Sequence, residues 1–367
     1  MPAPPSSQSP AHQLTRFVQV VPHQRALGMY FVSLEGGRGT LGLPYAERWV
    51  GNPETGVLHG GAVTALMDTT AGMAVFVALG GTHRIATLEL RLDYLRPATP
   101  GQPVHASAEC LKVTRNVAFV RCEAFHPDEP TERIALATGT FMIFRSEPTH
   151  VPAGGSKPRV MPEMPRSSAG TQEDAPKSPS AHASEAVPAD APESLSADAP
   201  EAVSADAARA TPAEDRAPSL LERIERAKRR GGRADLAGLV PYMVSLGIEF
   251  SSELIEGEQE LTATMRFAEH LIGNPALPAL HGGTLGGLLE TTAIVEALWR
   301  AESVVIPKIV SITVDYLRTG RPRDTHARAR IVKRGRRVLS VHVEAWQDDP
   351  KRPVATAHVH LLVIGKE

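Results

Sequence analysis

The positions from 88 to 93 alternate between apolar and polar residues: Leu88, Leu90 and Leu92 lie on one side, and Glu89, Arg91 and Asp93 on the other. This period predicts a strand with one buried face. The segment from Ala62 to about Leu79 is apolar nearly all round, which is typical of a helix enclosed by the rest of its domain. Further short strands are predicted at 28–34, 39–45, 102–115, 117–125 and 134–144. The pattern therefore predicts an α+β domain in which five or six antiparallel strands wrap around one long central helix.

This pattern occurs twice along the chain. The segments 45–53, 59–61 and 93–96 reappear as 267–275, 281–283 and 315–318. All three pairs share one offset of 222 residues, so a single register without gaps extends over about fifty residues. Such a register indicates a tandem duplication of one domain.

The two copies are separated by a segment of different composition. Residues 146–218 are dominated by Ala, Pro, Ser, Glu and Asp and contain no Phe, Trp or Tyr. A segment of this kind buries too little apolar surface to offset its chain entropy, which predicts a disordered linker. Ser219 and Glu222 then form a predicted capping box for a short helix. The expected organisation is a first domain at 13–145, the linker at 146–218 and a second domain at 219–367.

Charge and cysteine content narrow the functional class. The formal net charge is −2, and no basic tract favours binding to nucleic acid or to an anionic membrane surface. The first residues lack the basic and apolar regions of a secretory signal. Cys110 and Cys122 are too few for a disulfide framework and are predicted to be small buried residues on neighbouring strands. We expect a cytoplasmic protein.

The segment 52–61, followed by Asp68, resembles the PaaI-type hotdog acyl-CoA thioesterases, as does the segment 93–98. The resemblance covers about residues 15–145 and again about 219–365. It implies two hotdog domains that pair within the chain as a pseudo-dimer. It also implies hydrolysis of acyl-CoA thioesters, without metal or cofactor, at sites shared between the paired domains.

The two glycines at the start of each central helix are candidate oxyanion donors. The N–H groups of Gly60 and Gly61, and of Gly282 and Gly283 in the second copy, are expected to be free and to lie at the positive end of the helix dipole. A thioester oxygen placed there would be stabilised as its negative charge develops. The alternative is a tight loop-to-helix connection with no ligand.

Asp68 lies in the middle of the first central helix, among apolar residues. Burial of a lone carboxylate is costly, so this group needs either partners or a chemical task. Asp68 is about 12 Å from Gly60 along one helix, at 1.5 Å per residue. We therefore expect it to act on the Gly282 site of the other copy, and Glu290 to act on the Gly60 site. In catalysis the acid would be either a general base or a nucleophile. The alternative is that Asp68 has no catalytic role and is a hydrogen-bonded interface residue.

Other candidate residues have supporting roles. His59 and His281 are expected to orient the loop or the helix start rather than to transfer protons. The resemblance implies that Asn52 and Asn274 position water or the carbonyl, although both are also ordinary turn residues. It further implies that the Thr87 hydroxyl assists the acid.

The second copy departs from this pattern at three positions. It has Ile309 in place of Thr87, Pro278 in place of Gly56 and Glu290 in place of Asp68. We expect the site that uses Asp68 to perform most of the turnover.

Several weaker features also have a simpler structural explanation. Arg115 in the first copy, and Arg334, Arg336 and Arg337 in the second, fall at predicted hairpin turns. Arginine binds phosphate bidentately, so these residues are candidate contacts to CoA, with a solvated turn as the alternative. The glycine-rich segment 282–287 indicates close helix packing rather than dinucleotide binding, because no βαβ unit surrounds it.

The remaining alternatives concern function and assembly. A non-catalytic acyl-CoA-binding or regulatory hotdog protein is the main alternative to a thioesterase, and an enoyl-CoA hydratase of the same fold is less favoured. Symmetric association of the chain into a larger homo-oligomer is also plausible.

Overall fold

The computed structural model describes residues 14, 18–81, 83–144, 218–230, 238, 240–255, 258–276, 278–300 and 307–363. The predicted linker lies outside these residues, except for Pro218. The helix predicted after it is present as α4 (Leu220–Arg230). Its capping box is confirmed, because the Ser219 N–H donates to Glu222 Oε2 at 2.7 Å and the Glu222 N–H donates to Ser219 Oγ at 3.2 Å.

The first copy is built around one long helix. Its elements are α2 (Pro22–Leu27), β1 (Tyr30–Glu35), β2 (Arg38–Leu43), η1 (Glu47–Trp49), β3 (Val50–Asn52), β4 (Val57–Leu58), α3 (Gly60–Ala78), β5 (Arg84–Tyr94), β6 (Val104–Val113), β7 (Val117–His126) and β8 (Glu129–Phe144). By length and composition α3 is apolar enough to cross a membrane, yet 83% of its apolar window is buried inside the protein. It is the core helix that its all-round apolar sequence predicted.

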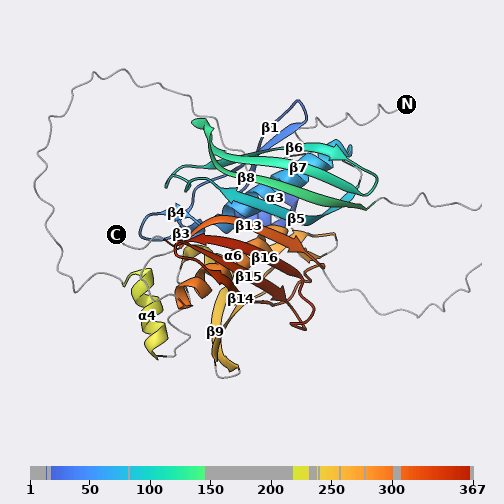
Figure 1. Ribbon diagram of the computed structural model, residues 1–367. Helices are drawn as coiled ribbons and strands as arrows, with labels where there is room; N and C mark the ends of the chain where they lie inside the picture. Colours follow the sequence, from blue (N-terminus) through green and yellow to red (C-terminus); the bar gives the residue numbers. More distant parts are fainter. Residues whose placement is uncertain are drawn as a thin grey trace, which may run out of the picture. The chain divides into compact units, whose positions relative to one another are not determined.

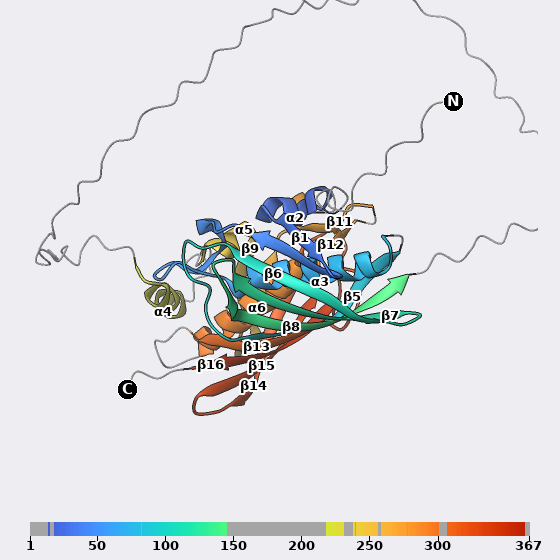
Figure 2. The same cartoon turned by 90° about the horizontal axis from the view of Figure 1, so that it is seen from above.

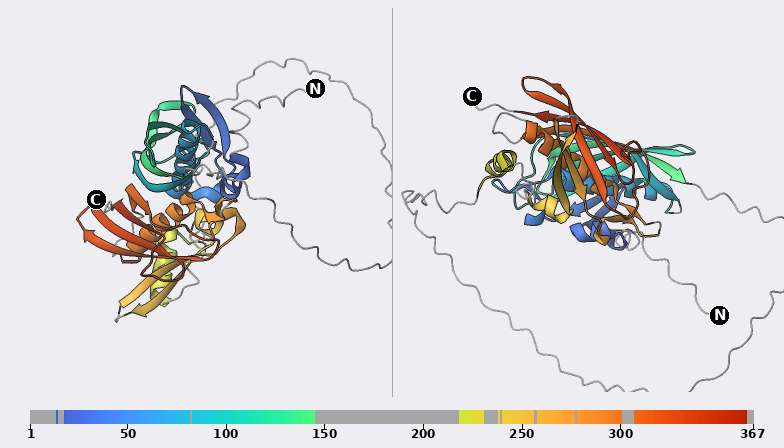
Figure 3. Two further views of the ribbon diagram at one scale, coloured as in Figure 1. Left: turned by 90° about the vertical axis from the view of Figure 1, so that its right-hand side faces the viewer. Right: turned by 90° about the horizontal axis from the view of Figure 1, so that it is seen from below.

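The second copy repeats this order of elements. After α4 come α5 (Pro241–Ser245), β9 (Ile248–Ile255), β10 (Glu258–Met265), η3 (Glu269–Leu271), β11 (Ile272–Asn274), β12 (Ala279–Leu280), α6 (Gly282–Arg300), β13 (Lys308–Tyr316), β14 (Thr325–Arg334), β15 (Val338–Trp346) and β16 (Ala355–Leu362). In Figure 3, each copy holds its long helix inside its own strands. This is the double hotdog arrangement that the resemblance implied.

The strands of both copies form one continuous sheet. Its twelve strands follow the order β1-β2-β6-β7-β8-β5-β13-β16-β15-β14-β10-β9, and Figure 1 shows β5 of the first copy beside β13 of the second. Seen from above in Figure 2, the strands follow this order from β1 at the top of the picture to β14 at the bottom. At the junction Arg91 pairs with Thr313, which is its own counterpart in the duplication. The two copies therefore meet about a pseudo-twofold axis, in the isologous manner of a symmetric dimer.

The two long helices cross through small residues near their first turns. A Cβ added to Gly61 would lie 2.8 Å from the Cα of Gly287, and one added to Gly283 would lie 2.4 Å from the Cα of Ala65. Only glycine allows backbones to approach this closely. The glycine-rich start of α6 thus serves helix packing, as the sequence predicted.

A bulge in β5 changes which side chains face the helix. Its register against β8 shifts between Thr87 and Glu89. Strict alternation would place Thr87 on the same outward side as Glu89 and Arg91. The extra residue at the bulge, Leu88, resets the alternation and turns Thr87 inward while Leu90 remains fully buried. The strand predicted at this position is correct, and its alternation is interrupted where the site begins.

Candidate active site

The first composite site joins the Asp68 side chain from α3 to the start of α6. A Cβ added to Gly282 would lie 2.7 Å from Asp68 Oδ2, so the carboxyl group lies directly against this backbone. Thr87 Oγ1 donates a hydrogen bond to Asp68 Oδ1 at 2.9 Å. His281 Nδ1 lies 3.6 Å from Asp68 Oδ2. The structure therefore brings Asp68 and Thr87 of one copy together with His281 and Gly282 of the other.

The second composite site has the same plan with the copies exchanged. Glu290 from α6 reaches the start of α3, where a Cβ on Gly60 would fall within 2.2 Å of Glu290 Oε1. His59 Nδ1 lies 3.5 Å from the same oxygen. Ile309 offers no hydroxyl group at the position of Thr87. Instead Tyr94, from the same copy as Gly60, donates to Glu290 Oε2 at 3.1 Å.

Each histidine caps the helix whose start it precedes. His59 Nδ1 accepts the Gly61 N–H at 2.9 Å, and His281 Nδ1 accepts the Gly283 N–H at the same distance. The ring proton is therefore on Nε2 in both cases. His281 Nε2 donates to Thr69 Oγ1 at 3.1 Å, and Thr69 in turn donates to a backbone carbonyl of α3. Both rings are thus neutral, hydrogen-bonded at each nitrogen, and suited to orient the helix start.

These contacts correct the expectation for the oxyanion donors. The N–H groups of Gly61 and Gly283 are not free, because the histidine rings accept them. The first N–H of each helix, on Gly60 and Gly282, has no hydrogen-bond acceptor among the described residues. The candidate oxyanion donor is therefore one amide per site, next to the acid of the other copy.

Burial controls the ionisation of the two acids differently. Asp68 is 6% exposed and Glu290 is 0% exposed. Burial raises the pKa of Asp68, while His281, the Thr87 hydroxyl and the Gly283 N–H lower it. Burial raises the pKa of Glu290 to about 8, against weaker opposing effects of Tyr94 and the Gly61 N–H. Each acid thus has one hydroxyl group and one helix-start amide that favour its charged form against the effect of burial.

The histidines ionise outside the neutral range. Burial lowers the pKa of His59 to about 3. Burial also lowers the pKa of His281, against the opposing charge of Asp68. The short distances from these rings to the two acids are therefore contacts of neutral rings and not ion pairs. A neutral ring does not act as a general acid, and the orienting role of the two histidines stays a prediction.

The remaining predicted residues lie at or beyond the edges of the sites. Asn52 Oδ1 accepts the Glu54 N–H, and Asn274 Oδ1 accepts the Ala276 N–H, both at 3.0 Å. These are the local turn bonds of an Asn before proline. The predicted hairpin arginines are all exposed: Arg115, Arg334, Arg336 and Arg337. Within the described ranges, no three His, Cys, Asp or Glu side chains gather as a metal site requires.

Two tyrosines that sequence reasoning passed over belong to these sites. Tyr94 accepts or donates a 2.8 Å hydrogen bond with Thr64 Oγ1 in addition to its bond to Glu290. Its counterpart Tyr316 donates to the Gly282 carbonyl at 3.0 Å, since Gly286 stands where the first copy has Thr64. Both tyrosines belong to the repeated segment Asp-Tyr-Leu-Arg, and this repetition is the sequence feature that could have indicated their place in the sites.

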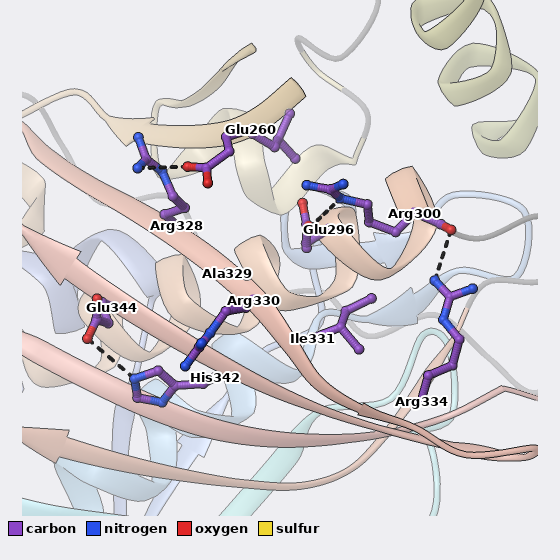
Figure 4. Close-up of a pocket in the computed structure, with 11 residues that line it drawn as sticks. Glu260, Glu296, Arg300, Arg328, Ala329, Arg330, Ile331, Arg334, His342 and Glu344 are labelled. Atoms are coloured by element: carbon purple, nitrogen blue, oxygen red, sulfur yellow. Dashed lines mark hydrogen bonds and ion pairs between the residues drawn. The ribbon is translucent and has the colours of Figure 1, made fainter. Parts of the chain in front are cut away.

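Two cavities lie away from the acids. A cavity of about 250 Å³ lies between the short helices of the two copies, and His23, Trp49 and Leu246 are among its lining residues. Its His23 ring lies 5.0 Å from the His281 ring, centroid to centroid. A second cavity of about 640 Å³ lies within the second copy (Figure 4). Neither of these two cavities is lined by Asp68 or Glu290.

Comparison with known proteins places both copies in one group of enzymes. The Thioesterase superfamily model matches residues 55–132, and the model for the Acyl-CoA thioesterase N-terminal domain matches residues 274–362. Medium/long-chain acyl-CoA thioesterase YigI of Escherichia coli (strain K12) is 33% identical over 143 residues, which is 35% of this chain and 88% of YigI. A putative esterase of Halobacterium salinarum is 33% identical over 129 residues, or 33% of this chain and 83% of its own length.

Two solved structures share the fold over nearly the whole chain. A putative thioesterase from Novosphingobium aromaticivorans DSM 12444 covers 91% of this chain and 98% of its own, with a TM-score of 0.50 and 14% identity. A putative thioesterase II from Thermobifida fusca YX covers 94% of this chain and 99% of its own, with the same TM-score and identity. At this identity the likeness concerns the double fold.

Proposed function

This chain belongs to the thioesterase superfamily, and from that premise we propose that it hydrolyses medium- or long-chain acyl-CoA thioesters at composite sites shared by its two copies. The observation that carries the proposal is the contact of the Asp68 carboxyl group with the backbone of Gly282. This contact supports a site in which one copy contributes the base and the other contributes the oxyanion donor. The acyl chain length follows the relative YigI and is part of the proposal.

The chemistry proposed for the Asp68 site is general-base hydrolysis. Asp68 takes a proton from a water molecule, which attacks the thioester carbonyl carbon, while the Gly282 N–H stabilises the oxyanion that forms. The intermediate collapses by cleavage of the carbon–sulfur bond, and the CoA thiolate takes up the proton from Asp68. The products are a free acid and CoA. Direct attack by the carboxylate is the other route open to the same geometry.

We propose that the two sites have unequal activity at neutral pH. A base must be deprotonated to accept a proton, and burial keeps the Glu290 pKa at about 8. Thr87 stabilises the charged form of Asp68 through its 2.9 Å hydrogen bond, whereas Glu290 has a 3.1 Å bond from Tyr94 in place of one from Ile309 and still has a pKa of about 8. The Asp68 site is therefore the main site of turnover, and the Glu290 site contributes as the pH rises.

The direct test is release of CoA thiol from a panel of acyl-CoAs that differ in chain length, with aryl-CoA included. We expect turnover of medium or long chains by the full chain and none by the Asp68→Asn, Glu290→Gln double variant. If the wild-type chain releases no thiol from any substrate of the panel, the proposal is refuted. Circular dichroism of the double variant controls for folding, since both changes preserve shape.

A second test addresses the shared nature of the sites. The isolated fragment 13–145 contains Asp68 and Gly60 but not the partner of either. It should be inactive as a monomer, or active only if it dimerises, because one copy alone exposes its apolar junction. Light scattering during the thiol assay distinguishes these cases, and an active monomer would contradict the composite sites.

We propose that the protein is cytoplasmic and that its chains can associate further into a homo-oligomer. Both thiols are free: Cys122 is buried on β7 and Cys110 is partly buried on the neighbouring β6. Unpaired cysteines favour a reducing compartment. The sheet ends at β1 and β9, whose outer edges face no other strand of the sheet.

A further inference from the structure

Each cap histidine, His59 or His281, is held on one face by an aromatic ring from the other copy. The ring of His23, in α2, lies 5.0 Å from the ring of His281, centroid to centroid, with the planes tilted by 45°. The ring of Tyr242, in α5, is stacked on His59 at 4.7 Å, with the planes 21° apart. His23 and Tyr242 are counterparts in the duplication, because each directly follows a Val-Pro pair and precedes a Leu-Gly pair at the same spacing. The same contact therefore occurs at both composite sites.

The two short helices reach these positions because each packs on the opposite copy. Figure 2 shows α2 beside β11, which belongs to the second copy. His23 Nδ1 donates to the His270 carbonyl of η3 at 3.2 Å. In the reverse direction, Ser245 Oγ of α5 donates to the Arg48 carbonyl of η1 at 2.9 Å. The position of each ring over the opposite histidine is therefore set by the pairing of the copies.

A histidine needs such support more than an ordinary helix cap does. The usual N-cap residues, Ser, Thr, Asp and Asn, reach the helix N–H with a short side chain. The His281 ring accepts the Gly283 N–H through Nδ1 and contacts Thr69 Oγ1 through Nε2 at 3.1 Å. These two bonds leave the ring free to tilt about the line between its nitrogens, since the χ2 torsion of histidine is itself broad. His23 packs on the face of the ring and opposes this tilt.

The two aromatic residues act through the faces of their rings and not through their polar atoms. His23 Nε2 and Tyr242 Oη are buried, and neither has a hydrogen-bond partner among the described residues. Burial lowers the pKa of His23, so its neutral ring lies against the neutral ring of His281. An unpaired buried polar atom costs stability, so neither atom accounts for the presence of its ring. What the two residues share is a flat side chain large enough to cover an imidazole.

The helix residue near the larger ring is smaller than its counterpart. A Cβ added to Gly287 would lie 2.9 Å from Tyr242 Oη and 3.1 Å from Tyr242 Cε1. The first copy has Ala65 at the position of Gly287 and His23 at the position of Tyr242. The tyrosine thus occurs together with a glycine, and the smaller histidine with an alanine. His23 also lines the cavity of about 250 Å³ between the short helices, which leaves room for a larger ring there.

We propose that His23 is a positioning residue for the Asp68 site and Tyr242 for the Glu290 site. The inference rests on the proposed hydrolysis. Each ring, which comes from the same copy as the acid, fixes the cap histidine, and the histidine fixes the first turn of its helix. The first N–H of that turn, on Gly282 or Gly60, is then held at the oxyanion. A tilted histidine displaces this N–H, and the loss appears in kcat rather than in KM, because the oxyanion forms only after attack.

The test separates the two sites by their acids. The Glu290→Gln chain retains only the Asp68 site, and the Asp68→Asn chain, assayed at pH 9 where Glu290 is ionised, retains only the Glu290 site. Thiol release from a medium-chain acyl-CoA is measured in both backgrounds. His23→Ala should lower kcat about tenfold in the first background and less than about twofold in the second, since the donor is displaced and not removed. Tyr242→Ala should show the reverse, and KM should change little in either case.

Four further variants test whether the ring face is what matters. His23→Tyr, which installs the ring of the second copy, and Tyr242→Phe should both keep the rates of their parents. Arg25→Ala and Val244→Ala are the matched controls, because these residues are exposed counterparts on α2 and α5. Circular dichroism of every variant reports on folding.

A second route disturbs the ring without removing it. Gly287→Ala places a methyl group against Tyr242, so it should lower kcat of the Glu290 site. Tyr242→His added to Gly287→Ala rebuilds the pair of the first copy and should restore the rate. This pair tests the inference even if the alanine variants of the rings do not fold.

The pattern of losses gives the answer. Losses confined to the assigned background, with rescue by the aromatic variants, support the inference. Equal losses in both backgrounds would mean that the rings only stabilise the fold, and a loss in Tyr242→Phe would mean that its hydroxyl group acts directly; either result overturns the positioning role. Active parents with unaffected ring variants overturn this inference alone. If neither parent releases thiol, the proposed hydrolysis fails and the inference fails with it.

Discussion

Removal of the charge on Asp68 should expose the pH dependence of the second site. In the Asp68→Asn variant only Glu290 remains as a catalytic acid. Burial holds the Glu290 pKa at about 8. A carboxyl group with this pKa is ionised in about one tenth of the molecules at pH 7 and in about nine tenths at pH 9. The residual rate of Asp68→Asn should therefore rise roughly tenfold between these two pH values.

The complementary variant should behave in the opposite way. Glu290→Gln removes the group that titrates near pH 8 and leaves Asp68 with its hydrogen bond from Thr87. It should keep most of the rate at pH 7 and lose the additional rate that the wild-type chain gains above pH 8. The difference between the two variants measures the share of each site.

The assay is thiol release from one medium-chain acyl-CoA at saturating concentration between pH 6 and pH 9.5. The double variant serves as the blank for spontaneous hydrolysis, which also increases with pH. Glu129→Gln, at an exposed glutamate of the first copy, controls for the loss of a negative charge as such. A flat profile for Asp68→Asn, or a Glu290→Gln variant that is silent at pH 7, would refute the assignment of the two acids.

Three further predictions concern stability and positioning. The folded pKa of Glu290 (about 8) exceeds its ordinary value of 4.5, so unfolding releases a proton between these pH values and the free energy of unfolding falls as pH rises. Glu290→Gln removes this loss. It should therefore stabilise the protein by on the order of 3 kcal/mol at pH 7 in urea melts, and by less at pH 5. Thr87→Val should raise the Asp68 pKa and move the acidic limb of kcat/KM upward by roughly one pH unit, whereas an unchanged limb would mean that Thr87 has only a packing role. Gly283→Ala should cost about 2–3 kcal/mol, because its Cβ would lie 2.4 Å from an α3 backbone atom. Gly72→Ala should be tolerated, because its Cβ would lie 3.7 Å from the nearest atom, which is in the Phe141 ring.

The duplication made much of the fold accessible from the sequence. One offset links Gly60, Asp68 and Asp93 to their counterparts, and the position of Asp68 two turns into its helix predicted that it serves the other copy. The structure brings Asp68 to Gly282 as that geometry requires. Helix rise and strand period are local properties, so they carry over reliably from sequence to structure.

What the sequence did not reveal depends on contacts across the fold. The inward turn of Thr87 comes from a bulge, which no periodicity announces. The Tyr94 hydroxyl finds Glu290 at a separation of 196 residues. The histidine caps occupy the N–H groups of Gly61 and Gly283 because each ring nitrogen needs a partner once it is buried. Each of these features follows from the need to pair a buried polar group, which is settled only in three dimensions.

The pairing of Arg91 with Thr313 on the pseudo-axis has a consequence for how the protein can change. In a homodimer every substitution appears twice, so a residue at such an axis must suit its own copy, and no site can be altered without its twin. A chain that carries both halves is released from this rule, and Arg91 already faces a different residue. One half can keep Asp68 with the Thr87 hydroxyl, while the other carries Glu290 with Ile309 in place of that hydroxyl and Tyr94 as the hydrogen-bond donor. Covalent linkage thus separates two selective pressures that symmetry would force onto a single sequence.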